Sequence, residues 1–234
     1  MRGLAVAGTI AAASALAAWA VRGRSSPVFG PSIYRGSAAR RSLALTFDDG
    51  PSEATPGLLR ILDEFGAAAT FFVCGRNVER LPGVAREVAA RGHEIGNHSW
   101  SHARFWLRSP AFIAQELARA QSAIRETTGR TPTLFRAPFG ARWFGLRHAQ
   151  RQMNLLGVMW TVVGLDWKLP AERIARRVLA AASNGAIVCL HDGRGLEPNP
   201  DIHETLAAVS RLLPELRGRG FAFETVSQLL CPNH

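Results

Sequence analysis

An apolar run that ends abruptly in two adjacent carboxylates constrains this chain more than any other feature. Residues 42–47 have the composition of a buried strand, and they are followed at once by Asp48, Asp49, Gly50 and Pro51. Isolated buried carboxylates are costly, so they normally pair with a cation, bind a metal or shift their pKa. Asp and Gly are also ordinary turn residues. Considered alone, the stretch is therefore explained equally well by a solvated turn after a strand.

Two histidines about fifty residues downstream suggest what the carboxylates are for. His98 and His102 are four residues apart, a spacing that lets both imidazoles point at one centre from a helical turn or a tight loop. Two imidazole nitrogens and one carboxylate oxygen form a common open site for a divalent metal. A solvated pair on a surface helix has the same spacing. His93, in the same stretch, is predicted to be a structural residue and not a third histidine ligand.

Two adjacent acids can divide the work of a hydrolytic site, one holding the cation while the other accepts a proton from water. Such a site also needs an acid to protonate the leaving group. A second apolar run, residues 185–190, ends at His191. An imidazole titrates near neutral pH and suits that task. A histidine hydrogen-bonded into a turn at the end of a strand is the alternative explanation.

These segments together resemble the polysaccharide deacetylase family, which is carbohydrate esterase family 4 or the NodB-homology domain. The resemblance covers roughly residues 40–230. It rests on five motifs in the family's order: Thr46-Phe47-Asp48-Asp49-Gly50-Pro51, His98-Ser99-Trp100-Ser101-His102, Arg136-Ala137-Pro138-Phe139-Gly140, Asp166-Trp167 and Leu190-His191-Asp192.

The resemblance implies a metal centre. Its ligands would be Asp49, His98 and His102. The cation would be divalent, usually zinc, with cobalt or another divalent ion as alternatives. Asp48 would then be the general base, placed outside the ligand set.

The remaining catalytic roles are also implied by the resemblance. His191 would be the general acid, oriented by Asp166, and Arg136 would lie against Asp48. A guanidinium in that position keeps the base ionised.

Three further residues, Phe139, Trp167 and Cys189, would bind substrate. The resemblance implies that the backbone N–H of Phe139 donates to the oxyanion and that Trp167 walls the acetyl pocket. Cys189 stands where the family has leucine, and Val163 stands where it often has a second aspartate. The smaller thiol at 189 is predicted to loosen the acetyl pocket or to suit a slightly different acyl group.

Segments of strand and helix type alternate through the main body. Helices are expected from residue 55, from 110 to about 128, over 171–183 and over 203–217, with a closing strand at 221–225. This alternation favours a parallel α/β sheet or barrel, and titratable residues at strand ends favour the barrel. The resemblance implies an irregular (β/α) barrel of seven or eight strands. We therefore predict a single catalytic domain over residues 40–230.

The first residues predict export. Residues 1–24 are apolar and Ala-rich between arginines, which is typical of a signal peptide or an N-terminal membrane anchor. The arginines that follow oppose export of the downstream chain. Export, secreted or anchored at the cell envelope, is nevertheless expected because the implied substrate lies outside the cytoplasm. Residues 25–39 would form a short tether.

Composition excludes two other classes. The net charge is +10, but the 28 basic residues, of which only Lys168 is lysine, are dispersed and not clustered with aromatic residues. A nucleic-acid partner is therefore not expected, and a general bias toward arginine explains the charge. Three cysteines, Cys74, Cys189 and Cys231, are too few for a disulfide framework.

The sequence predicts a metal-dependent hydrolase that removes N-acetyl groups from glycans containing N-acetylglucosamine. The polymer would be of the peptidoglycan, chitin or chito-oligosaccharide type. One alternative is a deacylase of a lipid-linked or small amino sugar or of an O-acetylated polysaccharide. Another is a non-catalytic glycan-binding protein of the same fold, which the departures at Val163 and Cys189 favour.

Overall fold

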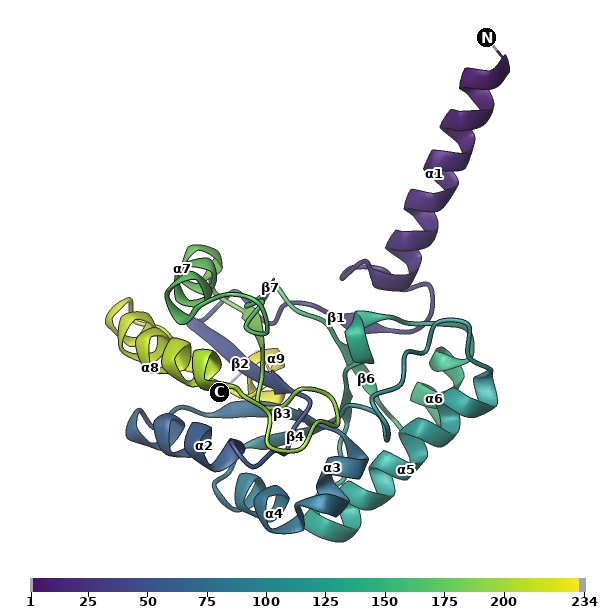
Figure 1. The fold of residues 1–234 in the computed structure, drawn as a ribbon. Coiled ribbons are helices and arrows are strands. Elements are labelled where there is room, and N and C mark those ends of the chain that lie inside the picture. The colour runs from purple at the N-terminus through teal and green to yellow at the C-terminus, as the bar shows by residue number, and fades with distance from the viewer. Residues whose placement is uncertain (1, 232–234) are drawn as a thin grey trace.

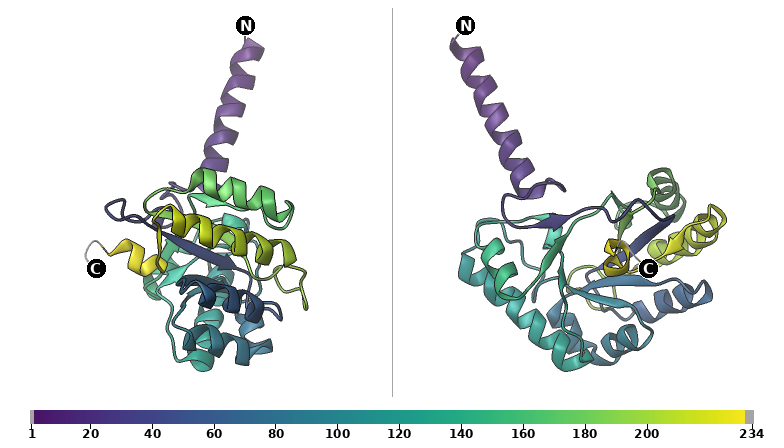
Figure 2. Two further views of the ribbon diagram at one scale, coloured as in Figure 1. Left: turned by 90° about the vertical axis from the view of Figure 1, so that its left-hand side faces the viewer. Right: turned by 180° about the vertical axis from the view of Figure 1, so that it is seen from behind.

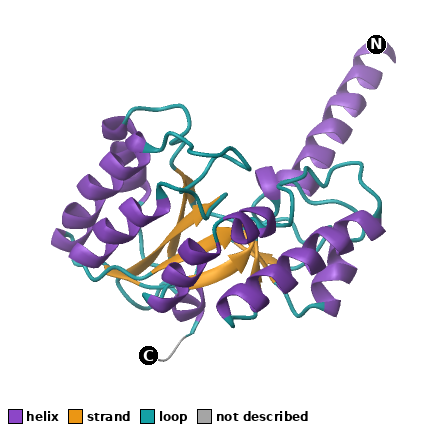
Figure 3. Ribbon diagram, turned by 60° about the horizontal axis from the view of Figure 1, so that its bottom comes forward, coloured by secondary structure: helices purple, strands orange, loops and turns teal. Residues whose placement is uncertain are grey.

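The computed structural model describes residues 2–231, with side chains from residue 12 onward. One parallel sheet forms its centre and helices surround it (Figures 1 and 3). The strands are β1 (Ser32–Ile33), β2 (Ser42–Asp48), β3 (Ala69–Val73), β4 (Glu94–Asn97), β5 (Leu134–Phe135), β6 (Leu156–Val158), β7 (Val162–Val163), β8 (Ala186–His191) and β9 (Ala222–Phe223). The helices are α1 (Arg2–Arg22), α2 (Thr55–Glu64), α3 (Gly75–Arg80), α4 (Pro82–Ala90), α5 (Pro110–Thr128), α6 (Leu146–Gln152), α7 (Ala171–Ala181), α8 (His203–Gly218) and α9 (Val226–Leu230), with a 3-10 turn at Pro138–Gly140.

The strand order is β1-β6-β5-β4-β3-β2-β8-β7, and β9 adds to β2. The sheet curls into a half-barrel, and an antiparallel bridge between Arg35 and Ala186 brings the chain after β1 back to β8. The predicted α/β single domain is confirmed. Nine strands lie within residues 2–231 because short edge strands, including β1 in the predicted tether, add to the central ones.

Alternate side chains of β2 point to opposite faces of the sheet, one forming the core and the other facing the candidate site. All seven residues of β2 are buried, as expected for a parallel strand that is covered on both faces. Leu43, Leu45 and Phe47 pack into the main core with residues of α2 and α8. Ala44 belongs to a second cluster on the concave side. Because strand side chains alternate, Asp48 also points to the concave side.

Helix boundaries follow local signals. α5 begins where Ser109 accepts a hydrogen bond from the Phe112 N–H (3.2 Å) and Pro110 occupies the first helical position. It ends at Gly129, whose φ of 70° is easily adopted by glycine. The predicted bounds of this helix are confirmed. The helices expected at 171–183 and 203–217 are α7 and α8.

Most of α1 projects away from the body, and its C-terminal end meets the domain (Figures 1 and 2). Among the residues that the structure describes, no helix has the length and apolar character needed to cross a membrane. The predicted signal peptide or anchor covers residues 1–24, and the side chains of its first eleven residues lie outside the described part.

A buried arginine holds the segment that joins α1 to the domain, residues 21–34, which we call the N-terminal arm. Arg142 is 3% exposed. Its Nη1 donates to the carbonyl of Ser26 (2.7 Å) and to Oγ of Ser32 (2.8 Å), and its Nη2 donates to the carbonyl of Gly23. Phe29 is buried against Trp143. Much of the predicted tether therefore lies against the α/β domain.

Replacing Arg142 with alanine should release the N-terminal arm. The substitution leaves buried carbonyls without a donor, which costs about 1–3 kcal/mol for each such group. Hydrogen exchange of the amides of residues 21–34, followed by mass spectrometry, should accelerate. Arg151→Ala is the matched control, because Arg151 is an exposed arginine of the same region. Equal exchange in both variants would show that Arg142 does not hold the arm.

Candidate active and metal site

The site lies where the central strands end. Asp48 ends β2 and His191 ends β8, and the two residues are paired in register. His98 follows β4 directly. Because all these strands are parallel, their carboxyl ends meet at one edge of the sheet. A pocket of about 570 Å³ opens there and is lined by eight of the ten predicted site residues, while Arg136 and Asp166 lie behind them.

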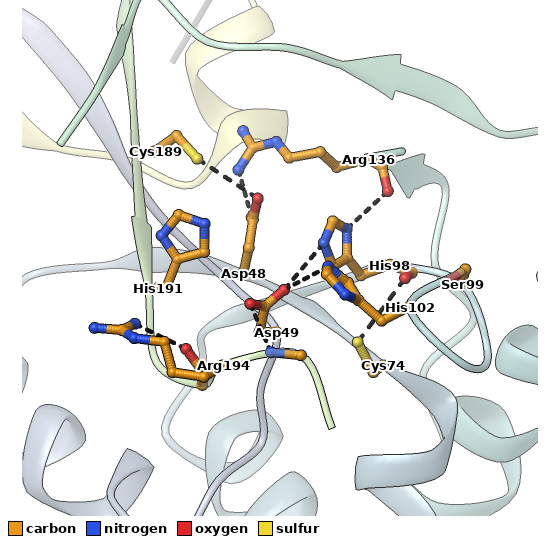
Figure 4. A network of polar contacts seen from close by, with 12 residues as sticks. Asp48, Asp49, Cys74, His98, Ser99, His102, Arg136, Cys189, His191 and Arg194 are labelled. Atoms are coloured by element: carbon orange, nitrogen blue, oxygen red, sulfur yellow. Dashed lines mark hydrogen bonds and ion pairs between the residues drawn. The ribbon is translucent and has the colours of Figure 1, made fainter. Parts of the chain in front are cut away.

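Asp49, His98 and His102 point at one another (Figure 4). Asp49 Oδ1 lies 3.3 Å from Nε2 of His98 and 3.0 Å from Nε2 of His102. His98 Nδ1 lies 2.8 Å from the carbonyl of Arg136. A carbonyl only accepts, so a neutral His98 carries its proton on Nδ1 and presents a lone pair at Nε2.

This arrangement fits a cation. Asp49 Oδ1 is buried and has no hydrogen-bond donor among the described residues. Its partners offer lone pairs, and the three ligand atoms lie within 4.8 Å of one another. Burial would raise the pKa of Asp49, but the neighbouring imidazoles of His102 and His98 lower it well below its usual value. A divalent ion would relieve the repulsion among these groups, and two imidazoles with one carboxylate form a standard open site.

The backbone around Asp49 turns its side chain away from that of Asp48. Asp49 has a φ of 77°, in the left-handed region that aspartate tolerates better than most residues. Its Oδ2 accepts from the Gly195 N–H (2.8 Å), and its carbonyl accepts from Nδ2 of Asn77 (2.7 Å). These bonds hold the predicted ligand in its orientation.

Asp48 is paired with an arginine and lies outside the three-ligand group. Arg136 Nη1 donates to Asp48 Oδ1 (2.6 Å) and to Oγ1 of Thr46 (2.7 Å). The Arg136 side chain has no exposed surface. Its Nε donates to the carbonyl of Val158 (3.1 Å) and its Nη2 to that of Met159 (3.2 Å). The guanidinium therefore fixes the orientation of the Asp48 carboxylate.

His191 and Asp166 form the second polar pair. Nδ1 of His191 lies 2.9 Å from Asp166 Oδ1, and Thr205 donates to Asp166 Oδ2 (2.7 Å). Burial alone would lower the pKa of His191, but the hydrogen bond and charge of Asp166, with the charges of Asp49 and Asp48, raise it to about 9. His191 therefore holds a proton at neutral pH and directs Nε2 away from Asp166.

Aromatic side chains form the walls of the pocket. Phe139 has a φ of 58°, and its ring lies 4.7 Å from that of His102. Trp167 meets His191 edge to face at 5.0 Å. Both aromatic side chains are about half exposed and so are available to a ligand. Cys189 is buried, and its Sγ lies 3.5 Å from Asp48 Oδ2.

Comparison with known proteins identifies the family. The family model for polysaccharide deacetylases matches residues 35–158. A chitooligosaccharide deacetylase from Bradyrhizobium is 37% identical over 205 residues, which are 84% of this chain and 94% of that protein. The chain belongs to the polysaccharide deacetylase family.

Other relatives show the range within the polysaccharide deacetylases. The peptidoglycan-N-acetylglucosamine deacetylase PgdA of Listeria monocytogenes is 35% identical over 202 residues, 85% of this chain. The chain spans only 41% of the length of that relative. The structure of a family 4 pseudoenzyme from Bacillus anthracis matches with a TM-score of 0.78 at 26% identity, over 87% of this chain and 70% of the other. Membership alone therefore does not establish catalysis.

The structure adds pocket residues that sequence reasoning missed. Arg22, Trp160, Arg194 and Gly195 also line the pocket. Arg194 and Gly195 follow the last motif closely, and that proximity is a usable signal. Arg22 is brought there by the N-terminal arm, for which the sequence carries no local signal. His93 is buried and does not belong to the Asp49, His98 and His102 group.

Removing one imidazole should destroy the metal site. We expect His102→Ala to lower zinc affinity by more than about 100-fold, because outer-shell partners alone contribute about 10–100-fold. Competition with a chromophoric chelator measures the change. His148→Ala removes an exposed histidine of α6 and is the matched control. Zinc affinity that is the same in both variants would show that His102 is not a ligand.

Proposed function

We propose that this chain is a metal-dependent hydrolase that removes N-acetyl groups from N-acetylglucosamine-containing glycans of the peptidoglycan or chitin type. One observation carries the proposal. Asp48 lies outside the metal-ligand group and is paired with Arg136, while a protonated His191 lines the same pocket. A base and an acid beside one cation site are what amide hydrolysis requires.

Asp49, His98 and His102 would hold the cation, and we propose zinc, with cobalt or another divalent ion as alternatives. Such an ion acts as a Lewis acid and lowers the pKa of water at the site. Asp48 accepts a proton from the attacking water. Arg136 orients the carboxylate through the hydrogen bond to its Oδ1.

His191 donates its proton to the departing amine. The hydrogen bond from Nδ1 to Asp166 leaves Nε2 free to do so. Asp166 also stabilises the charged imidazole before the transfer. The products are acetate and a free amino sugar.

The remaining predicted residues would bind the acetamido group. The backbone N–H of Phe139 is proposed as the donor to the oxyanion. Trp167, Cys189 and Val163 line the pocket and would contact the acetyl methyl group. A deacetylase acting on envelope glycans would work outside the cytoplasm, either secreted or attached through residues 1–24.

Two other functions are alternatives to this proposal. Deacylation of a lipid-linked or small amino sugar, or of an O-acetylated polysaccharide, uses the same chemistry on another substrate. The pseudoenzyme relative and the departures at Val163 and Cys189 give some support to a non-catalytic glycan-binding role. Neither departure removes the base, the acid or a ligand, so we favour the enzyme.

Replacing the base tests the proposal directly. The purified chain with zinc or cobalt should release acetate from chito-oligosaccharides or peptidoglycan. Asp48→Asn should lower kcat by about 10²–10⁴-fold, the usual contribution of a general base. Asp63→Asn, an exposed carboxylate, is the matched control. An inactive parent on every acetylated glycan tested would overturn the enzyme proposal.

The pH dependence tests the acid. His191 is protonated below its pKa of about 9 and loses the proton above it, so kcat/KM should fall on the alkaline side. Asp166→Asn removes the charge that raises this pKa and should move the alkaline limb to lower pH. Asp201→Asn removes the partner of the exposed His203 (2.6 Å) and should leave the limb in place. A limb that does not move in Asp166→Asn would contradict the assignment of His191.

A further inference from the structure

A second group of potential metal ligands lies in the same pocket and shares no residue with the first. Asp48, Cys189 and His191 each offer one ligand atom, and these atoms lie within 4.8 Å of one another. We call this group the Asp48–Cys189–His191 cluster. Cys189 and Asp48 are buried, and His191 is partly exposed toward the pocket.

The sheet brings these side chains together by register. Asp48 is paired with His191 across β2 and β8, and Thr46 is paired with Cys189. Side chains two residues apart on a strand share a face. Val188 and Leu190 pack into the outer core, so Cys189 and His191 both point to the concave side, as Asp48 does.

The bonds to Arg136 and Asp166 leave Asp48 Oδ2, His191 Nε2 and Cys189 Sγ as the potential ligand atoms. Asp48 Oδ1 is held by Arg136 (2.6 Å), which leaves Oδ2 facing the Cys189 thiol at 3.5 Å. His191 Nδ1 is held by Asp166 (2.9 Å), which leaves Nε2. A ligating histidine usually has its other nitrogen on a carboxylate, as here. Nitrogen, oxygen and sulfur donors together suit zinc.

We propose that the Asp48–Cys189–His191 cluster binds a second zinc-type divalent ion. On binding, the S–H bond of Cys189 and the Nε2–H bond of the protonated His191 break and both protons pass to solvent, so that the thiolate and the imidazole nitrogen each donate an electron pair to the ion. No oxidant or reductant is required. The ion neutralises the buried thiolate and carboxylate, which would otherwise be costly in this position.

Occupation of this cluster would switch the hydrolase off. The ion would take the free oxygen of Asp48 and the free nitrogen of His191, which are the proposed base and acid. This consequence rests on the proposed function, whereas binding of the ion does not. Cys189 decides whether a second ion can bind, because the leucine that the family has at that position offers no ligand atom.

Cobalt titration of the full chain tests the site without any substrate. The experiment uses a Cys231→Ser background, because Cys231 is the exposed thiol. The first equivalent of cobalt should give a spectrum that lacks a thiolate-to-cobalt charge-transfer band. The second equivalent of cobalt should add this band in the near-ultraviolet. Cys189→Ser, or Cys189→Ala, should lack that band. Cys74→Ser, which removes the other buried thiol, should retain it.

The absence of the band in the parent, or its persistence in Cys189→Ser, would overturn the second site. Acetate release tests the consequence. Zinc beyond one equivalent should inhibit the parent, and Cys189→Ala should need more than about 100-fold more zinc for the same inhibition, because outer-shell partners alone contribute about 10–100-fold. Equal inhibition of both would overturn the inhibitory role. An absence of acetate release from every glycan would overturn the proposed function, while the cobalt spectrum would still decide the site.

Discussion

The buried guanidinium of Arg136 is the group on which the rest of the site depends. Its side chain binds the Asp48 carboxylate, and its carbonyl lies 2.8 Å from Nδ1 of His98. One residue thereby orients both the proposed base and a proposed metal ligand. Four groups on the barrel's concave side hold the guanidinium: Asp48, Thr46 and the carbonyls of Val158 and Met159. The ring of Phe72 packs 4.1 Å from the guanidinium carbon.

A buried ion pair is weak evidence for stability, because desolvation offsets much of the attraction between the charges. Removing one partner of the pair has a different effect. It leaves the other charge buried without a counter-ion, which costs about 3–5 kcal/mol of stability. Asp48 is 4% exposed, so without Arg136 its carboxylate would lose its hydrogen-bonded counter-ion in a buried position. The pair is therefore better explained as an arrangement that orients a carboxylate at the pocket than as a source of stability.

Part of this arrangement follows from local sequence signals. The bounds of α5 follow from Ser109, Pro110 and Gly129, which act within one turn of the helix ends. The strand-end positions of Asp48 and His191 follow from apolar runs that stop at those residues. The structure brings Asp49, His98 and His102 together, as the order of the motifs predicted, and their roles in metal binding remain proposals.

Other parts depend on contacts between distant segments. Arg142 binds residues 23–32, which lie more than a hundred positions earlier in the chain, and no local sequence pattern predicts that contact. The N-terminal arm, and with it Arg22 at the pocket, was therefore missed. The thiol of Cys189 near Asp48 is a similar case, because it depends on the register between β2 and β8. Local signals thus predicted the elements, and the register between strands decided which side chains share the pocket.

Anomalous diffraction from crystals grown with one equivalent of zinc tests the central claim most directly. We expect one peak at about 2.0–2.2 Å from ligand atoms of Asp49, His98 and His102, the bonding distance for zinc and such ligands. Asp48 should remain on Arg136 and outside the coordination sphere. A zinc ion that is bonded to Asp48 at this stoichiometry, or the absence of a peak at these three residues, would contradict the account.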